Sequence, residues 1–97
     1  MARDAEAVFD ISIVSPEGTL YESPAASLVV PAELGYMGIL ANHAPAMASL
    51  APGRITVREP GGAIAAFSNL GRGFIEVNRN RATLLVERVE SLPSAGA

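Results

Sequence analysis

The sequence predicts an all-β protein, a two-sheet β-sandwich of about ten short strands, and two observations support this fold class. Short apolar segments, several of which alternate apolar and polar residues, recur along the chain, separated by clusters of Gly, Pro, Asn and Ser. No amphipathic run is long enough for a helix of more than about two turns. Two sheets packed face to face would bury the apolar faces of such strands in a chain of 97 residues.

The first expected strand shows the alternation most clearly, with Phe9, Ile11 and Ile13 on one face and Asp10 and Ser12 on the other. Successive side chains of a strand point to opposite faces of the sheet, so this pattern indicates a strand that is buried on one side. We therefore expect the face with the three apolar residues to line the core.

The next segments continue the all-β pattern. Residues 15–18 form a Ser-Pro-Glu-Gly turn, in which proline presets φ and glycine tolerates positive φ. We expect a short strand at residues 19–22 that stops before Pro24. Residues 26–30 are apolar on both faces, so we expect this strand to lie inside the stack of sheets.

The second half of the chain follows the same plan. Further strands are expected at residues 38–40, 54–59, 63–68, 74–78 and 82–89. Residues 46–50 fit either half a helix or a short strand, and the sequence leaves both interpretations open. Residues 60–62 and 79–81 fit the tight turns of two hairpins.

Length and composition predict a single folded domain. We place this domain at residues 8–89, with an N-terminal tail at residues 1–7 and a C-terminal tail at residues 90–97. A hydrophobic share of 49% is that of a globular protein rather than a disordered one. A net charge of −3 argues against a nucleic-acid partner. The absence of cysteine excludes disulfides and thiolate metal sites.

No segment is expected to insert into a membrane. Residues 34–53 carry no formal charge and have the length of a spanning helix, but Gly35, Gly38, Pro45 and Pro52 interrupt them. A backbone interrupted in this way could not satisfy its own hydrogen bonds in lipid. The N-terminus also lacks the apolar segment of a signal peptide.

Catalytic chemistry is not expected either. The chain has one histidine, His43, in a proline-bounded turn, and no Gly-x-Ser-x-Gly elbow that could pair a nucleophile with it. The glycine pairs Gly35/Gly38 and Gly71/Gly73 lack the other residues of phosphate-binding or dinucleotide motifs, so we interpret them as turn glycines. We therefore predict no enzyme activity, no metal and no cofactor, and interpret the pattern as that of a binding or structural module.

The order of four segments nevertheless carries a resemblance to a known family. These segments are VFDISIVSPEGTLYES, SLVVPAELGYMGILANHAP, LAPGRITVRE and FSNLGRGFIEVNRNRATLLVE. In this order they resemble the N-terminal domain of the ε subunit of rotary F-type ATP synthases, a module called δ in mitochondria. The similarity runs from about Val8 to Val89.

The resemblance implies a mechanical function. A ten-stranded sandwich of this family lies at the foot of the central stalk, binds the γ subunit along its side and touches the c ring with its lower loops. It locks the rotor so that torque from proton flow through the ring reaches γ. A chain of this kind is a non-catalytic, peripheral subunit at the cytoplasmic face of the bacterial inner membrane.

Two groups of residues match contact positions of the family. Glu33, Leu34, Gly35 and Tyr36 match the loop that faces the c ring. The family commonly has an acid at the position of Tyr36, and Glu33 is the candidate to replace it.

The second group matches positions near γ. It comprises Ser15, His43 and Ala48, with Asn42 and Pro45 shaping the turn around the histidine. Asn42 replaces a glycine that is common in the family, and asparagine tolerates left-handed backbone better than most residues. We therefore expect the turn to be preserved.

The resemblance stops before the helical hairpin with which the family usually continues. The sequence is either a naturally short form or a segment that ends at the domain border, and in both cases we expect no hairpin-based inhibition and no nucleotide binding by these residues. Two alternatives compete with the rotor role. A stand-alone ligand-binding sandwich is disfavoured by the absence of Trp, and a small hydrolase by the missing triad.

Overall fold

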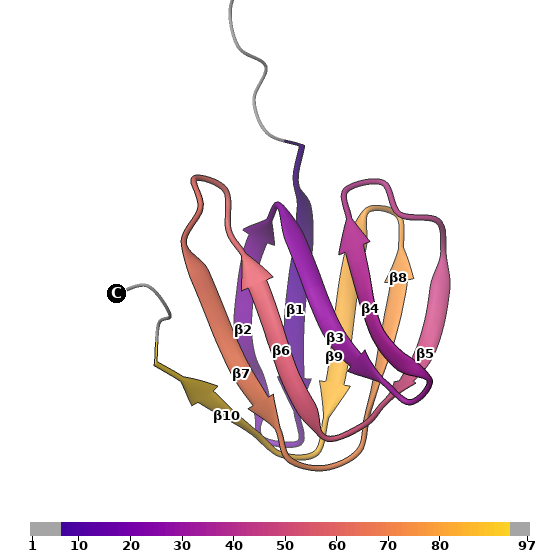
Figure 1. The fold of residues 1–97 in the computed structure, drawn as a ribbon, viewed down its shortest axis with the longest axis vertical. Helices are drawn as coiled ribbons and strands as arrows, with labels where there is room; N and C mark the ends of the chain where they lie inside the picture. The colour runs from indigo at the N-terminus through magenta and orange to yellow at the C-terminus, as the bar shows by residue number, and fades with distance from the viewer. Residues whose placement is uncertain (1–6, 94–97) are drawn as a thin grey trace, which may run out of the picture.

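A computed structural model describes residues 7–93, which form ten strands and, within that range, no helix. The ten strands shown in Figure 1 have the following bounds: β1 (Phe9–Ser15), β2 (Gly18–Ala25), β3 (Ser27–Ala32), β4 (Gly35–Leu40), β5 (Ala46–Leu50), β6 (Gly53–Arg58), β7 (Ile64–Asn69), β8 (Gly73–Asn78), β9 (Arg81–Val86) and β10 (Val89–Leu92). The predicted all-β class is confirmed.

The strands form one continuous sheet that folds over into two layers. The hydrogen-bonded order is β10-β7-β6-β3-β5-β8-β9-β1-β2, and β4 pairs with β3 beside this path. All neighbouring pairs are antiparallel except β1 and β9, which are parallel. β3, β4, β6 and β7 cover β1, β2 and β9 in Figure 1, so the layers stack as expected for a sandwich.

The two layers are joined where β3 meets β5. Only Ala32 and Leu50 pair in register between these strands. The amide of Glu33 donates to the carbonyl of Ser49 at 3.0 Å, and the amide of Ala51 donates to that of Pro31 at 2.7 Å. These bonds carry the chain from one layer to the other, so the expected two sheets are two halves of one sheet.

The core fills the space between the layers with aliphatic side chains. The largest fully buried apolar ones are Ile11, Ile13, Leu28, Val30, Ile39, Leu50, Ile55, Val57, Ile75 and Leu84. The expected inward face of the first strand is confirmed, because Phe9, Ile11 and Ile13 are at most 2% exposed. Burial of this apolar area is the main driving force for the fold.

Tyr21 of β2 connects one end of the folded sheet with the β6–β7 hairpin near its other end. Its hydroxyl donates to Oε2 of Glu59 at 2.6 Å, and its ring meets the ring of Phe67 edge-on with 5.0 Å between centroids. Burial, together with the hydrogen bond to Glu59, raises the pKa of Tyr21 to about 12. β2 and the hairpin of β6 and β7 are thereby held together without a backbone ladder.

A buried asparagine organises the turns at the lower end of Figure 1. Asn69 is 1% exposed, and its Nδ2 donates to the carbonyl of Ala51 at 2.9 Å and to that of Gly71 at 3.0 Å. One side chain thus connects the β5–β6 turn with the β7–β8 turn. Buried backbone carbonyls need such donors when no strand pairs with them.

Three expectations about strands need correction. The strand expected to stop before Pro24 continues as β2 to Ala25, because β2 is an edge strand in which proline need not donate a hydrogen bond. β3 was expected to be buried on both faces, but Val29 is 39% exposed because its side chain lies on the outer face of its layer and no described segment covers it. The strand expected at residues 38–40 begins earlier, at Gly35, as β4.

The remaining differences concern the middle and the end of the chain. Residues 46–50, left open between helix and strand, are β5 and pair with β8 from Ala46 opposite Val77 to Leu50 opposite Gly73. The domain was expected to end at residue 89, whereas β10 pairs with β7 up to Leu92. The expected tail residues 1–6 and 94–97 lie outside the described residues.

Candidate functional site

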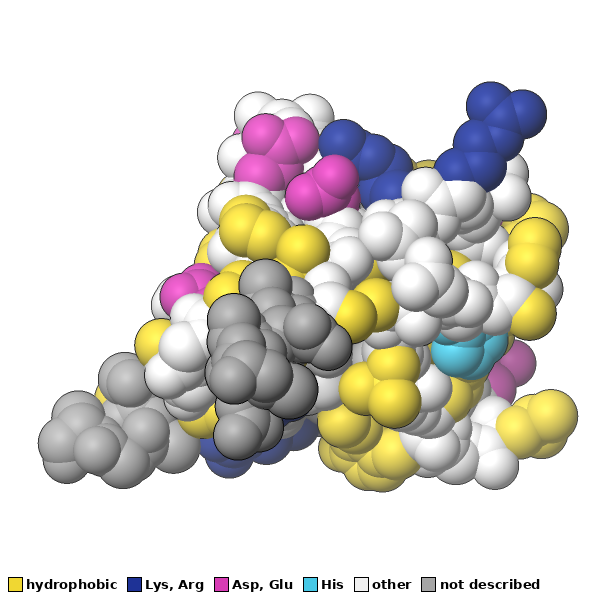
Figure 2. Space-filling view, turned by 90° about the horizontal axis from the view of Figure 1, so that it is seen from above, with side chains coloured by type: hydrophobic (Ala, Val, Ile, Leu, Met, Phe, Trp, Pro, Cys, Tyr) yellow, Lys and Arg dark blue, Asp and Glu magenta, His cyan; other side chains and the backbone are white. Residues whose placement is uncertain are grey.

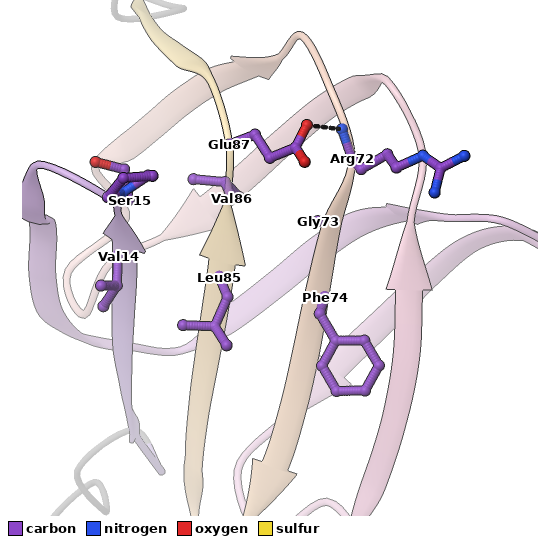
Figure 3. Close-up of a pocket in the computed structure, with 9 residues that line it drawn as sticks. Val14, Ser15, Arg72, Gly73, Phe74, Leu85, Val86 and Glu87 are labelled. Atoms are coloured by element: carbon purple, nitrogen blue, oxygen red, sulfur yellow. Dashed lines mark hydrogen bonds between the residues drawn. The ribbon is translucent and has the colours of Figure 1, made fainter.

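The outer face of the β1-β9-β8 layer carries a row of apolar side chains. Val14 of β1 lies opposite Leu85 of β9, which in turn lies opposite Phe74 of β8. Leu85 is 51% exposed. Figure 3 shows the three side chains on adjacent strands, lining a hollow of about 450 Å³. We call Val14, Phe74 and Leu85 the apolar row.

The sequence analysis did not identify this row, although a signal was present. At residues 13–14, 74–75 and 84–85 two apolar residues follow each other and break the alternation of their strands. In each pair one residue faces the core and is at most 1% exposed, so its neighbour must face outward. Apolar residues that lie next to one another on the outer face of a sheet are a feature of docking surfaces.

Polar groups border the hollow at the lower end of the molecule. The amide of Arg72 donates to Oε1 of Glu87 at 3.4 Å (Figure 3), and the amide of Glu87 donates to the carbonyl of Arg72 at 3.2 Å. Gly73 follows Arg72 and lies opposite Val86, and a Cβ there would stand 2.9 Å from the carbonyl oxygen of Leu85. Glycine is therefore required for β8 and β9 to approach each other beneath the hollow.

The loop predicted to face the c ring is the β3–β4 turn at the lower end of Figure 1. Leu34 at its tip is fully solvent-exposed, and Glu33 and Gly35 are exposed beside it. Tyr36 is also exposed, and its Oη accepts a hydrogen bond from the amide of Arg54 at 3.1 Å. Its hydroxyl holds β4 against the start of β6. Glu33 is the acidic residue of the loop.

Ala48, predicted to lie near γ, shares a second hollow with this loop. The hollow has a volume of about 430 Å³ and is lined by Ala32, Glu33, Leu34, Gly35, Tyr36, Met37, Met47, Ala48 and Ser49. Ala48 lies opposite Ile75 and is packed against the core. Its neighbour Met47 is 66% exposed and presents the larger apolar surface.

The turn around His43 lies at the upper end of the molecule. Asn42 adopts a φ of 64°, which confirms the left-handed backbone conformation expected at this position. The amide of His43 donates to the carbonyl of Leu40 at 3.2 Å, and its Nδ1 lies 2.6 Å from the carbonyl oxygen of Ala44. A carbonyl only accepts, so Nδ1 is the donor in this contact. Figure 2 shows this imidazole at the surface of the upper end.

Ser15 lies at the opposite end from His43. It is 9% exposed, and its Oγ donates to Oε1 of Glu17 at 3.1 Å while accepting from the amide of Glu17 at 3.2 Å. β1 has 7 residues, and Asn42 is tied to the segment before it, so Ser15 lies roughly 20 Å from the histidine turn. The predicted γ contacts therefore spread along the length of the molecule and include no single compact patch.

Among residues 7–93, no three His, Asp or Glu side chains come together in an arrangement that could hold a metal ion. Within the same range, no helix is long and apolar enough to cross a membrane.

Comparisons with known proteins give the family. The model of the family described as ATP synthase, Delta/Epsilon chain, beta-sandwich domain matches residues 8–92. The chain belongs to this delta/epsilon family. An ATP synthase epsilon chain from Sinorhizobium fredii is 39% identical over 81% of this chain and 58% of its own length. One from Latilactobacillus sakei is 38% identical over 93% of this chain and 63% of its own length.

Solved structures agree with the delta/epsilon fold. A chain in the cryo-EM structure of the Euglena gracilis mitochondrial ATP synthase, which includes the c-ring, has a TM-score of 0.81 at 22% identity, covering 94% of this chain and 57% of that one. A chain of the Tetrahymena thermophila central stalk and c-ring has a TM-score of 0.71 at 13% identity, over 89% and 68%. The present delta/epsilon chain thus spans about 60% of the length of the curated relatives it matches.

Proposed function

We propose that this chain is a rotor subunit of a bacterial proton-driven ATP synthase that links the γ subunit to the c ring. The match of the delta/epsilon family to residues 8–92, which is nearly all of the described fold, carries this proposal. Its relatives are epsilon chains, and its structural neighbours come from ATP synthase assemblies that include the c-ring. The role is mechanical and needs no catalytic group, cofactor or bound nucleotide.

A part that transmits torque must resist deformation, and a continuous sheet around one core favours such stiffness. Residues of every strand either line or pack against one dense core, and the layers are joined at β3–β5 and again at Tyr21. Dense aliphatic packing makes such a core nearly incompressible. Load applied to one layer would therefore be transmitted to the other.

The apolar row is the part of the surface that fits γ along the side of the domain. Val14, Phe74 and Leu85 form an apolar strip beside Ser15, in which Leu85 is exposed and the other two are partly exposed, with Arg72 and Glu87 at its border. An apolar centre with a polar border is the usual anatomy of a protein interface. Asn42 and His43 extend this contact toward the upper end.

The β3–β4 turn is the part that fits the c ring. Leu34 projects completely into solvent, and Glu33 provides a negative charge next to it. Gly35, with a φ of 132°, and Tyr36 fix the shape of the turn. In this arrangement the domain is a peripheral subunit at the cytoplasmic face of the inner membrane, held there by protein contacts.

Replacement of Leu85 by Asp tests the γ contact. A charge at the centre of the apolar row would be desolvated on binding, so we expect the affinity for the γ subunit of the same organism to fall at least about tenfold. Isothermal titration with purified γ measures this. Val29→Asp is the matched control, because Val29 is a similarly exposed strand residue in the other layer.

Equal affinities of wild type and Leu85→Asp would remove the apolar row from the interface. No binding of γ by the wild-type chain would contradict the rotor role itself. Circular dichroism of each variant checks that the fold is retained.

A further inference from the structure

Asn80 joins three separate segments of the chain at the upper end of the molecule. Its side-chain Oδ1 accepts a hydrogen bond from the amide of Asn42 at 2.7 Å. Its Nδ2 donates to the carbonyl of Val8 at 2.9 Å, and its own carbonyl accepts from the amide of Asp10 at 3.2 Å. The β4–β5 turn, the β8–β9 turn and the start of β1 therefore meet at one residue.

The backbone around these bonds is held in an uncommon conformation. Asn42, Arg79 and Asn80 have φ angles of 64°, 52° and 60°, and these are the only non-glycine residues with positive φ among those described. The left-handed region disfavours residues with a Cβ, and asparagine is among those that tolerate it best. Two of these residues face each other across the Asn42–Asn80 hydrogen bond, which supports both turns.

We infer that Asn80 is the positioning residue of the Asn42–His43 turn, the turn that the proposed function assigns to the γ contact. The expected effect on γ binding rests on the proposed function, whereas the positioning role of Asn80 does not. The turn joins β4, which pairs with β3, to β5, which pairs with β8. The 2.7 Å bond to Asn80 connects this turn to the β8–β9 turn. Because Nδ2 is at the same time bonded to Val8, Asn80 fixes the orientation of His43 relative to β1 and not merely to its own strand.

The two side-chain bonds of Asn80 are on the surface, where one hydrogen bond contributes little to overall stability. Val8 is 38% exposed, and the pairing of β1 with β2 and with β9 is independent of the side chain of Asn80. Loss of this side chain should therefore free the turn without unfolding the domain. A positioning role and a general stabilising role can be separated on this basis.

The test uses Asn80→Gly, which removes both side-chain bonds while keeping a residue that accepts positive φ. Amide hydrogen exchange by NMR is measured for the whole chain. We expect the amide of Asn42 to exchange at least about fivefold faster and the backbone signals of His43 to shift, while core amides such as that of Ile13 keep their protection. Unchanged exchange at Asn42 would overturn the inference.

Two further variants make the result specific. Arg79→Gly removes an exposed side chain from the neighbouring left-handed position of the same turn, so the exchange of Asn42 should stay at the wild-type rate. Asn80→Asp keeps the acceptor for Asn42 but loses the donor to Val8, so Asn42 should stay protected while the backbone signals of Val8 shift. An equal response to Arg79→Gly and Asn80→Gly would contradict the assigned role.

Binding of γ then distinguishes this inference from the proposed function. If the turn contacts γ, Asn80→Gly should weaken the affinity about three- to tenfold through faster dissociation, because a disordered turn must be ordered again on binding. Faster exchange at Asn42 without any change in affinity would leave Asn80 as the positioning residue and remove the turn from the γ contact.

Discussion

The two ends of the molecule are each organised by one asparagine, and the two side chains differ in burial. Asn69 at the lower end is 1% exposed and donates to two turn carbonyls from within the protein interior. Asn80 at the upper end is partly exposed and bridges an amide and a carbonyl beside solvent. The same amide group therefore connects neighbouring turns in two different environments.

The difference in environment decides what each bond does. A hydrogen bond in a dry interior is costly to lose, since the separated groups cannot turn to water instead. A bond at the surface is replaced by water at small cost, so its effect is on local geometry. The structure therefore predicts that Asn69 supports the fold itself, whereas Asn80 sets the position of a single turn.

Asn69→Asp should have the largest effect and tests this contrast most directly. The variant removes the donor to Ala51 and Gly71 and places a carboxylate next to two carbonyl oxygens. An unpaired buried charge costs about 3–5 kcal/mol, a large part of the roughly 5–15 kcal/mol that stabilises a typical domain. Urea denaturation at neutral pH measures the loss.

Asn78→Asp is the control, because Asn78 is an exposed asparagine on the outer face of β8. It should change the free energy of unfolding by less than about 0.5 kcal/mol. Similar losses in the two variants would contradict the role assigned to the burial of Asn69.

A smaller effect is expected for Gly73→Ala at the same end. A Cβ at residue 73 would stand 2.9 Å from the backbone oxygen of Leu85 and 3.3 Å from the side chain of Leu50, so β8 and β9 would have to separate. Overpacking of this kind costs about 1–3 kcal/mol, measurable by thermal denaturation. Gly38→Ala in β4 meets nothing within 4 Å and should be neutral or slightly stabilising.

The smallest expected effect is that of Tyr21→Phe, and it depends on pH. The pKa of Tyr21 rises from 10.0 to about 12 because the ring is buried and its hydroxyl donates to Glu59, at the hairpin of β6 and β7. The folded state favours the neutral phenol, so this contribution is complete below pH 10 and disappears as pH rises through about 12. Tyr21→Phe should be less stable than wild type at pH 8, by about 1 kcal/mol.

The gap between Tyr21→Phe and wild type should then shrink between pH 10 and pH 12, which urea titrations at several pH values can follow. A constant gap over that interval would show that the Tyr21 hydroxyl does not contribute to the closure of the sheet through its bond to Glu59.

Much of the fold could be predicted from the sequence because it depends on local patterns. The alternation at residues 9–13 fixed which face of β1 is buried, and the family resemblance anticipated both the ten strands and the epsilon-chain relationship. The left-handed conformation of Asn42 was expected from the family resemblance, because Asn42 replaces a glycine that is common there. Which residues touch γ and the c ring stays a prediction, since no partner is part of the structure.

The apolar row and the two asparagines could not be found from local patterns alone. Val14, Phe74 and Leu85 are far apart in the sequence and come together only through the pairing of β1 with β9 and of β9 with β8. Asn69 and Asn80 both occur in segments that read as ordinary strand ends or turns. Only the pairing of the strands places each of them next to its acceptors and donors.

The sequence by itself determined the all-β class and the inward face of β1, because hydrophobic periodicity and turn residues act between near neighbours in the chain. The order of four segments indicated the family. The tertiary structure decided that the layers are one continuous sheet, that Tyr21 closes it against Phe67 and Glu59, and that each end depends on one asparagine. These features depend on contacts between residues distant in sequence, which exist only once the chain has folded back on itself.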